Sequence, residues 1–463
     1  MKDENIKELT SEKTEFNREV SVWGAISVMG GIMIGSGIFY IGSYALMRSG
    51  MSQGLALLAW ILGGVVSLLG ALCYAELGTM MPKAGGAQIY LNEAYHPCVG
   101  YAKAFSAWII GGPASIAALA IALPTACRAF FDISDTGIKV IGIALIIILT
   151  ALNSFGIALG DKISKYSMIA KLIPICLILV AGMLFGKATP NLSLVPQDGS
   201  PVSFTSIISM IAFSVVATLW AYDGWANVSA IAEEIKEPHK NLPKALILGV
   251  GGITVLYTLF NYSIYRVLDM DTIKAMLDSG DYYLGTEAAK VVLGNAGGIV
   301  VILAMIFAML SSMNGMIITY PRMTYAMAKD GHFFKMFGTL NPKYKIPLNA
   351  IICQAIICCI FVIFQDLSSL TVLVTFCGLL WNFLVVVGVI IMRKKYPDLP
   401  RPYKVKGYPW LVIVSSLAFF GLIVNQIITK PRTVYLGIFV PAIAIVIYFI
   451  FDKKLKAEAA GDK

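Results

Sequence analysis

The sequence predicts an all-α polytopic membrane protein with twelve transmembrane helices. Of its 463 residues, 58% are hydrophobic and only 14% are charged, whereas soluble domains carry about 25% charged residues. The mean hydropathy is +0.77. A soluble core could not bury this much apolar surface, which excludes a cytosolic enzyme, a disordered chain and a nucleic-acid-binding protein. The net charge of +9 is interpreted as basic loops on the cytoplasmic side of a membrane.

Twelve apolar segments approach or exceed the length of about 20 residues that a bilayer-spanning helix needs. They are residues 22–47, 53–78, 98–126, 138–158, 164–186, 204–233, 244–266, 295–320, 347–365, 369–392, 409–429 and 433–452. An even number of spans places both chain ends on one side. With the N-terminus inside, 26 of the 36 lysines and arginines lie in inner stretches and nine in outer ones, and Lys171 lies within a span. Both termini are therefore predicted to be cytoplasmic.

Two of these segments carry an interruption of the kind that breaks a membrane helix. The first contains Gly35-Ser36-Gly37 near its middle, where glycine has a large entropic cost in a helix. The sixth contains Asp223-Gly224 within an apolar run. Because these segments are five apart, helices 6–10 are expected to repeat helices 1–5 with opposite topology.

This repeat gives the predicted organisation of the chain. It comprises a cytoplasmic tail (1–20), a first repeat (21–203), a second repeat (204–392), two further spans (393–452) and a cytoplasmic tail (453–463).

An unwound membrane helix exposes N–H and C=O groups, which are tolerated only when they line a cavity or bind something. The new helix N-terminus suits a carboxylate. The opposing carbonyls suit an ammonium group. One pocket with both fits an α-amino acid zwitterion, and transporters built from inverted repeats use this arrangement. The alternative interpretation is close helix packing at Gly-x-Gly, and the pairing of two breaks favours the binding site.

Several short patterns occur in order along about 300 residues. They are Gly35-Ser36-Gly37-Ile38-Phe39, Ala75-Glu76-Leu77-Gly78, Pro82-Lys83-Ala84-Gly85-Gly86, Pro113-Ala114-Ser115, Ala221-Tyr222-x-Gly224-Trp225, Glu233-Glu234-x-x-x-Pro238 and Ser311-x-x-Asn314-Gly315. At these residues the chain resembles the amino acid–polyamine–organocation (APC) superfamily. Within it, the chain is most similar to the L-type amino acid transporter (LAT) family and its bacterial serine/threonine and alanine/serine exchangers.

The resemblance implies a LeuT-type fold with a 5+5 inverted repeat and alternating access. It implies that the N–H groups of Ser36, Gly37 and Ile38 hold the substrate carboxylate, and that Trp220 is an aromatic gate. It also implies that three carbonyls hold the ammonium group, those of Met33, Trp220 and Asp223. Gly35 and Gly224 complete the expected substrate site.

Two departures from the family pattern affect the expected partners. Asp223 stands where animal members often have glycine, so its side chain can reach the substrate amine or a neighbouring group. No cysteine lies between Arg128 and Gly137, where animal members bond to an accessory heavy-chain glycoprotein. Such a partner is therefore not expected, and a stand-alone bacterial protein is favoured.

Three polar positions each allow two interpretations. Lys171 lies deep in the fifth segment, where a lysine either snorkels to the interface or, as the resemblance implies, replaces the sodium of sodium-coupled relatives. Ser311 and Asn314 either line the pocket or tie helices together. Glu76, at the inner end of the second segment, is expected to form a salt bridge or a helix end at the cytoplasmic face.

These observations predict a secondary transporter in the cell membrane. The expected activity is sodium-independent exchange of small neutral L-amino acids such as serine, threonine or alanine. One alternative is a proton-coupled symporter of a cationic amino acid or amine, in which Asp223 and Lys171 carry the charge. Another is a membrane sensor that binds an amino acid without moving it. No catalytic residues, cofactor or metal are expected, because no cluster of nucleophiles, bases or metal ligands occurs in the spans.

Overall fold

The computed structural model describes residues 20–35, 37–82, 86–128, 131–154, 172–173, 175–329, 331–343 and 346–461. The regular secondary structure of this part is helical, apart from an isolated bridge between Val20 and Ile235. In chain order its labelled helices are α2 (Val22–Met33), α3 (Gly37–Arg48), α4 (Gln53–Met80), α5 (Ala87–Ala94), α6 (Pro97–Ser106), η1 (Ala107–Gly111), α7 (Gly112–Cys127), α8 (Asp135–Ser154), α10 (Phe204–Tyr222), η2 (Trp225–Glu234), α11 (Pro238–Val267), α12 (Met270–Asp278), α13 (Leu284–Lys329), η3 (Lys335–Gly338), α14 (Leu348–Phe364), α15 (Leu367–Lys395), α16 (Trp410–Thr429) and α17 (Pro431–Gly461).

Within the described residues, nine helices are long and apolar enough to cross a membrane, and the bent pair α2–α3 brings the number to ten. Two shorter apolar helices cover Ile175–Phe185 and Leu348–Phe364. The chain is therefore a multi-pass membrane protein. The predicted segment 164–186 is described only in part, because residues 155–171 and 174 lie outside the described residues.

Side-chain caps fix the start of several helices. The Ser21 hydroxyl accepts a hydrogen bond from the Gly24 N–H, and the Ser52 hydroxyl accepts one from the Leu55 N–H. The Asp366 carboxylate caps α15 in the same way. Each cap satisfies an N–H that has no partner inside the helix, which matters most where water is scarce.

Large apolar side chains are exposed along the outer helices. The exposed fraction is 57% for Ile147 on α8 and 59% for Phe439 on α17. It is 70% for Leu184 in the short helix Ile175–Phe185. Such side chains would be unfavourable in water, and they suit a surface that faces lipid.

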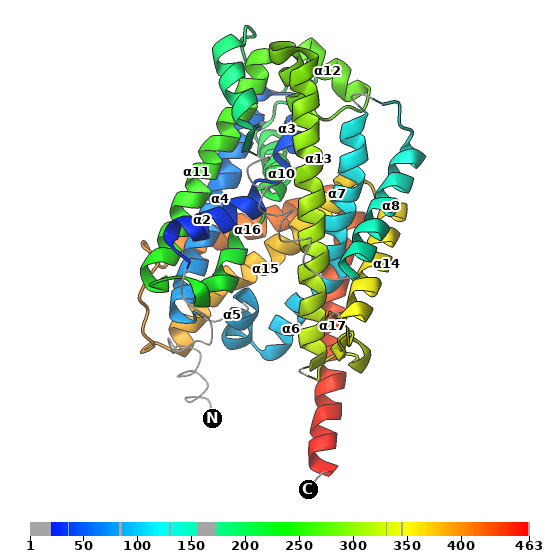
Figure 1. The fold of residues 1–463 in the computed structure, drawn as a ribbon. Coiled ribbons are helices and arrows are strands. Elements are labelled where there is room, and N and C mark those ends of the chain that lie inside the picture. Colours follow the sequence, from blue (N-terminus) through cyan, green and yellow to red (C-terminus); the bar gives the residue numbers. More distant parts are fainter. Residues whose placement is uncertain are drawn as a thin grey trace.

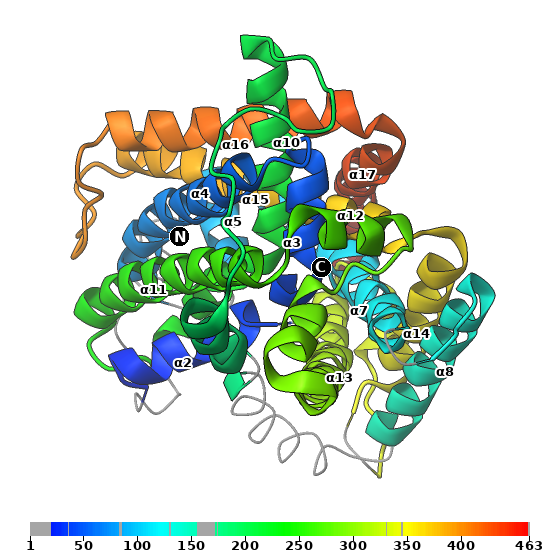
Figure 2. The same ribbon diagram turned by 90° about the horizontal axis from the view of Figure 1, so that it is seen from above.

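The second half of the first broken helix, α3, lies in the interior of the bundle, whereas α2 lies at its edge (Figure 2). Seen from above, α3 is surrounded by α4, α10 and α13 (Figure 2), and it packs against all three. In Figure 1, α8 and α14 lie at one side of the bundle, and the C-terminal end of α17 extends beyond it, at the same end as α5 and α6. The stretch 267–294 carries a short helix, α12.

Candidate functional site

The first interruption separates α2 from α3. α2 ends at Met33, α3 begins at Gly37, and the two helices are bent by 57°. Ile34 leaves the helical conformation with φ −77° and ψ 73°, and the Gly35 N–H donates to the Met33 carbonyl at 2.8 Å. The break predicted from Gly35-Ser36-Gly37 is therefore confirmed, although Ser36 itself lies outside the described residues.

The second interruption separates α10 from η2. α10 ends at Tyr222, and Asp223 takes an extended conformation with φ −64° and ψ 140°. Gly224 follows with φ +125°, a backbone conformation that glycine adopts without the steric penalty of a Cβ atom. The break predicted from Asp223-Gly224 is confirmed.

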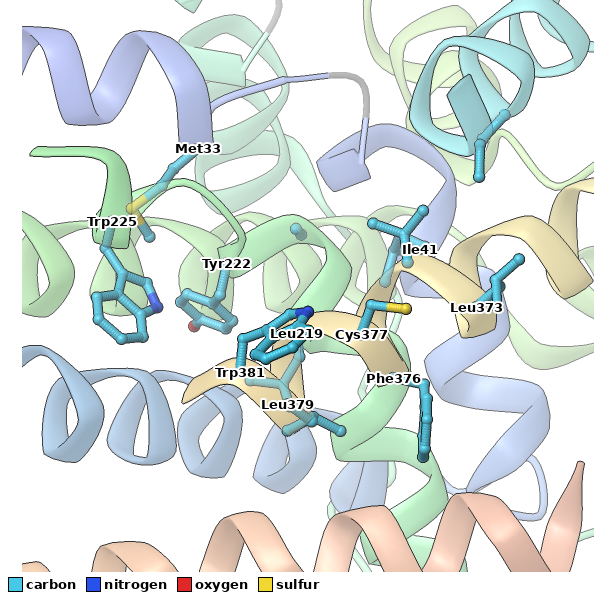
Figure 3. Close-up of a cluster of buried hydrophobic side chains, with 14 of the residues drawn as sticks. Met33, Ile41, Leu219, Tyr222, Trp225, Leu373, Phe376, Cys377, Leu379 and Trp381 are labelled. Carbon is cyan, nitrogen blue, oxygen red and sulfur yellow. The ribbon is translucent and has the colours of Figure 1, made fainter. Parts of the chain in front are cut away.

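The two interruptions touch each other. A Cβ atom built on Gly37 would lie 3.0 Å from Trp220 Cδ1 and 3.2 Å from Ala221 Cα. A Cβ atom built on Gly224 would lie 3.2 Å from the Met33 backbone nitrogen. Glycine at both positions therefore lets the broken backbones approach at van der Waals distance. Figure 3 shows Met33 and Trp225, one from each broken segment, in the same cluster of buried side chains.

Tyr257 on α11 joins the two interruptions. Its hydroxyl lies 2.6 Å from the Met33 carbonyl oxygen and 3.2 Å from the Ala221 carbonyl oxygen. The ring is completely buried and packs edge-on against Trp60, with centroids 5.4 Å apart. A single O–H therefore serves two carbonyls, one from each broken segment.

A cavity of about 160 Å³ lies beside the second interruption. Its walls come from α4, α5, α6, η1, η2, α13, α15 and the break itself. The lining residues are Tyr74, Ala87, Lys103, Ser106, Ala107, Gly111, Asp223, Ala226, Asn227, Ser229, Tyr320, Val374, Cys377, Gly378, Trp381 and Asn382. A smaller cavity of about 30 Å³, lined in part by Trp220, shares Asp223, Val374, Gly378 and Asn382 with it. Two contacting helix breaks thus lie beside a partly polar hollow.

Comparison with known proteins identifies the family. The amino acid permease family model matches residues 20–451, which contain both interruptions and the whole cavity wall. The chain belongs to the amino acid permease family. Residues quoted above for the resemblance to the LAT branch of the APC superfamily lie within that match.

Curated relatives agree with this assignment and are transporters. The permease is 29% identical to the serine/threonine exchanger SteT of Bacillus subtilis over 446 residues, which cover 96% of this chain and 99% of that protein. It is 31% identical to the b(0,+)-type amino acid transporter 1 of Mus musculus over 95% of this chain and 88% of that protein. It is 27% identical to the human Asc-type amino acid transporter 1, over 95% of this chain and 83% of that protein.

The structure of the permease brings most of the expected substrate residues together. Asp223 lines both cavities and Trp220 the smaller one. Met33, Gly37 and Ile38 are buried at the first interruption, beside the second, and are not among the lining residues of these two cavities. Of the remaining expected residues, Gly35 is partly exposed and Gly224 is buried. Ser36 and Lys171 lie outside the described residues.

Asn314 is bonded to a neighbouring helix. Its side-chain oxygen accepts a hydrogen bond of 2.7 Å from the Asn153 amide, which joins α13 to α8. Ser311 is also buried, and neither residue is among those lining the two cavities. For Asn314 this geometry favours the interpretation as a tie between helices.

Lys103 is a site residue that the sequence analysis missed. It was counted as a basic residue of an inner stretch, whereas the permease structure places it in α6 on the wall of the larger cavity. The available signal was its position inside the predicted span 98–126, because a lysine in a span usually faces a water-filled cavity or a partner. Tyr257 gave no comparable signal, since tyrosine is frequent in this chain.

Glu76 forms the expected salt bridge. Its two carboxylate oxygens accept hydrogen bonds of 2.7 Å and 2.6 Å from Nε and Nη2 of Arg393. A third bond of 2.7 Å comes from the Val405 N–H. The side chain is only 1% exposed, so this paired carboxylate fixes the stretch after α15 against α4.

Proposed function

We propose that the permease is a secondary active exchanger of small neutral L-amino acids such as serine, threonine and alanine, working without sodium. The observation that carries the proposal is the contact between two helix interruptions beside a partly polar cavity. Such a site offers unpaired backbone groups of both polarities to one small zwitterion. The printed activity of SteT, a serine/threonine exchanger that this chain matches over 99% of its length, supports the substrate class and the exchange mode.

The proposed contacts follow the polarity of the helix ends. The N–H groups of Ser36, Gly37 and Ile38, at the start of α3, would hold the carboxylate. The carbonyls of Met33, Trp220 and Asp223 would hold the ammonium group. The hydrogen bond from Tyr257 to the Met33 carbonyl supports this arrangement, because it holds that oxygen in a fixed position beside the second interruption.

The proposed transport cycle is alternating access in a twelve-span LeuT-type fold with a 5+5 inverted repeat. The spans that would rock together are α2–α3, α4, α10–η2 and α11. Their mutual packing supports this grouping, since α4 contacts α10 and α11, and α2 contacts η2 and α11. Trp220, on the wall of the smaller cavity, would close over the substrate.

In the proposed orientation, both termini lie in the cytoplasm. The permease would lie in the plasma membrane and act without an accessory protein. With this orientation, α5 and α6 lie on the inner side, because they lie at the end of the bundle where α17 terminates (Figure 1). The larger cavity is bounded by both elements, so it would belong to the inner half of the permease.

Lys171 would provide the positive charge that coupled relatives take from sodium. On this proposal, Lys171→Ala abolishes exchange while leaving the folded protein in the membrane. Uptake by Lys171→Ala proteoliposomes equal to that of the unaltered chain would contradict the role.

Uptake of labelled serine into proteoliposomes tests the proposed activity. Exchange predicts that uptake requires internal serine, threonine or alanine and is unchanged when sodium is replaced by potassium. Uptake into empty liposomes that responds to a pH gradient would instead support the proton-coupled symporter. Saturable binding without any uptake would support the sensor. Either of these results would contradict the proposed exchange activity.

A further inference from the structure

Two charged side chains face the larger cavity among the described residues. Lys103 reaches the wall from α6, and Asp223 reaches it from the interruption after α10. The other described lining residues are uncharged, and several are polar, including Ser106, Asn227 and Asn382. The described wall therefore carries one positive and one negative charge.

The two charges act on each other across this hollow. Both side chains line the same cavity, so their opposite charges interact through it. Opposite charges that line one cavity, where the protein walls exclude part of the water, attract more strongly than they do in bulk water. A lysine inside a membrane span is costly and is retained where it faces a cavity or a counter-charge. Lys103 has both.

We propose that Lys103 sets the charge selectivity of the permease, because its ammonium group is the counter-ion of Asp223 and keeps the cavity closed to amino acids with a cationic side chain. This inference deepens the proposed function and rests on it. It goes beyond the backbone contacts of the zwitterion, since it concerns the side chain of the substrate.

The physical reason is electrostatic repulsion between the Lys103 ammonium group and the cationic side chain of an unwanted substrate. Asp223 alone would make the wall negative, and a lysine or arginine side chain would gain from approaching it. The positive charge of Lys103 offsets the negative charge of the carboxylate and repels a second cation. Specificity of this kind depends on such a repulsive element as much as on attraction to the right ligand. A neutral side chain meets no net charge and is accepted.

Competition measurements in proteoliposomes test this assignment. Exchange of labelled serine is measured while unlabelled lysine, alanine or glutamate competes from outside. The variants are Lys103→Met, Asp223→Asn and the double variant. Lys274→Met is the matched control, because Lys274 is exposed on α12, far along the chain from the cavity wall.

Lys103→Met is expected to strengthen inhibition by lysine relative to alanine by about tenfold, which corresponds to about 1.4 kcal/mol. Asp223→Asn is expected to shift the ratio the other way and to favour glutamate. The double variant is expected to return the ratio toward that of the unaltered chain, since the wall is neutral again. Lys274→Met is expected to leave it unchanged.

The results separate this inference from the proposed function. If the unaltered chain exchanges serine and Lys103→Met leaves the lysine-to-alanine ratio unchanged, Lys103 only extends its ammonium group to the interface and the inference fails. If the unaltered chain moves no neutral amino acid, the proposed function fails instead. Should Lys103→Met not reach the membrane, Lys103→Gln and Asp223→Asn provide the same comparison, and equilibrium binding of labelled lysine and alanine gives the ratio for a folded variant that does not transport.

Discussion

At the scale of single residues, Gly224 has the most constrained backbone in the site. Its φ of +125° is strained for any side chain, and a Cβ atom there would also lie 3.1 Å from Ile32 Cβ. Glycine thus allows both the sharp exit from α10 and the close approach of α2. No other residue type meets both requirements.

Replacing this glycine is expected to damage the permease. Gly224→Ala should destabilise the folded state by roughly 1–3 kcal/mol from backbone strain, with a further cost from the contact with Ile32. Thermal unfolding in detergent measures the effect, and serine exchange should fall with it. Gly421→Ala is the control, because Gly421 lies in α16 with nothing within 4 Å of an added Cβ atom. Equal melting temperatures for the two variants would contradict this view of Gly224.

Tyr257 is the second residue whose role is local and measurable. Tyr257→Phe removes one hydroxyl and leaves two buried carbonyls with fewer donors. The expected loss of stability is about 0.5–1.5 kcal/mol, the usual net value of one hydrogen bond. The apparent affinity for serine should also weaken, since the Met33 carbonyl is no longer held in place.

Tyr262→Phe, on the same helix, is the matched control for this test. It removes a hydroxyl from a partly exposed tyrosine and should change neither stability nor affinity. An unaltered serine affinity in Tyr257→Phe, with a lower melting temperature only, would limit Tyr257 to a structural role.

At the scale of elements, the carboxylate of Glu76 anchors α4 to the stretch that follows α15. Besides Arg393 and the Val405 N–H, it attracts Arg401, whose Nε lies 3.8 Å away. Arg401 in turn donates to the carbonyls that end α15, with a bond of 2.6 Å to Tyr396. Tyr408 covers the Arg393 guanidinium at 3.8 Å. The buried Glu76 carboxylate is thus surrounded by hydrogen-bond donors from α15 and from the stretch that follows it.

Glu76→Gln tests this anchor. Removing one partner of a buried ion pair typically costs about 3–5 kcal/mol, because the remaining charges lose their compensation. We expect a marked drop in melting temperature and poor recovery of folded protein. Lys240→Gln breaks an exposed pair with Glu237 and should have no measurable effect, since such pairs contribute little. Similar melting temperatures for both variants would contradict the anchoring role.

At the scale of the whole molecule, the proposed orientation makes opposite predictions for two exposed positions. Ser279→Cys, after α12, should react with a membrane-impermeant maleimide added to intact cells. Lys404→Cys, in the stretch between α15 and α16, should react only after the membrane is permeabilised. The unaltered chain gives the background from its native cysteines. Labelling of Lys404→Cys in intact cells would contradict cytoplasmic termini.

The sequence predicted what is local and missed what depends on tertiary packing. The interruptions were found because Gly35-Ser36-Gly37 and Asp223-Gly224 are poor helix formers wherever they occur. The ion pair of Glu76 was expected because a charge near a span end needs a partner, yet its partner Arg393 is more than 300 positions away along the chain. Lys103 and Tyr257 were missed because only the fold brings them to Asp223 and Met33.

The bridge between Val20 and Ile235 has a mechanical consequence for the molecule. It joins Val20, two residues before α2, to Ile235, directly after η2, and the Lys236 N–H reinforces it with a bond of 2.9 Å to the Val20 carbonyl. The two broken spans are thus hydrogen-bonded to each other at one end and in van der Waals contact at their interruptions. We therefore expect the two spans to tilt together and not independently.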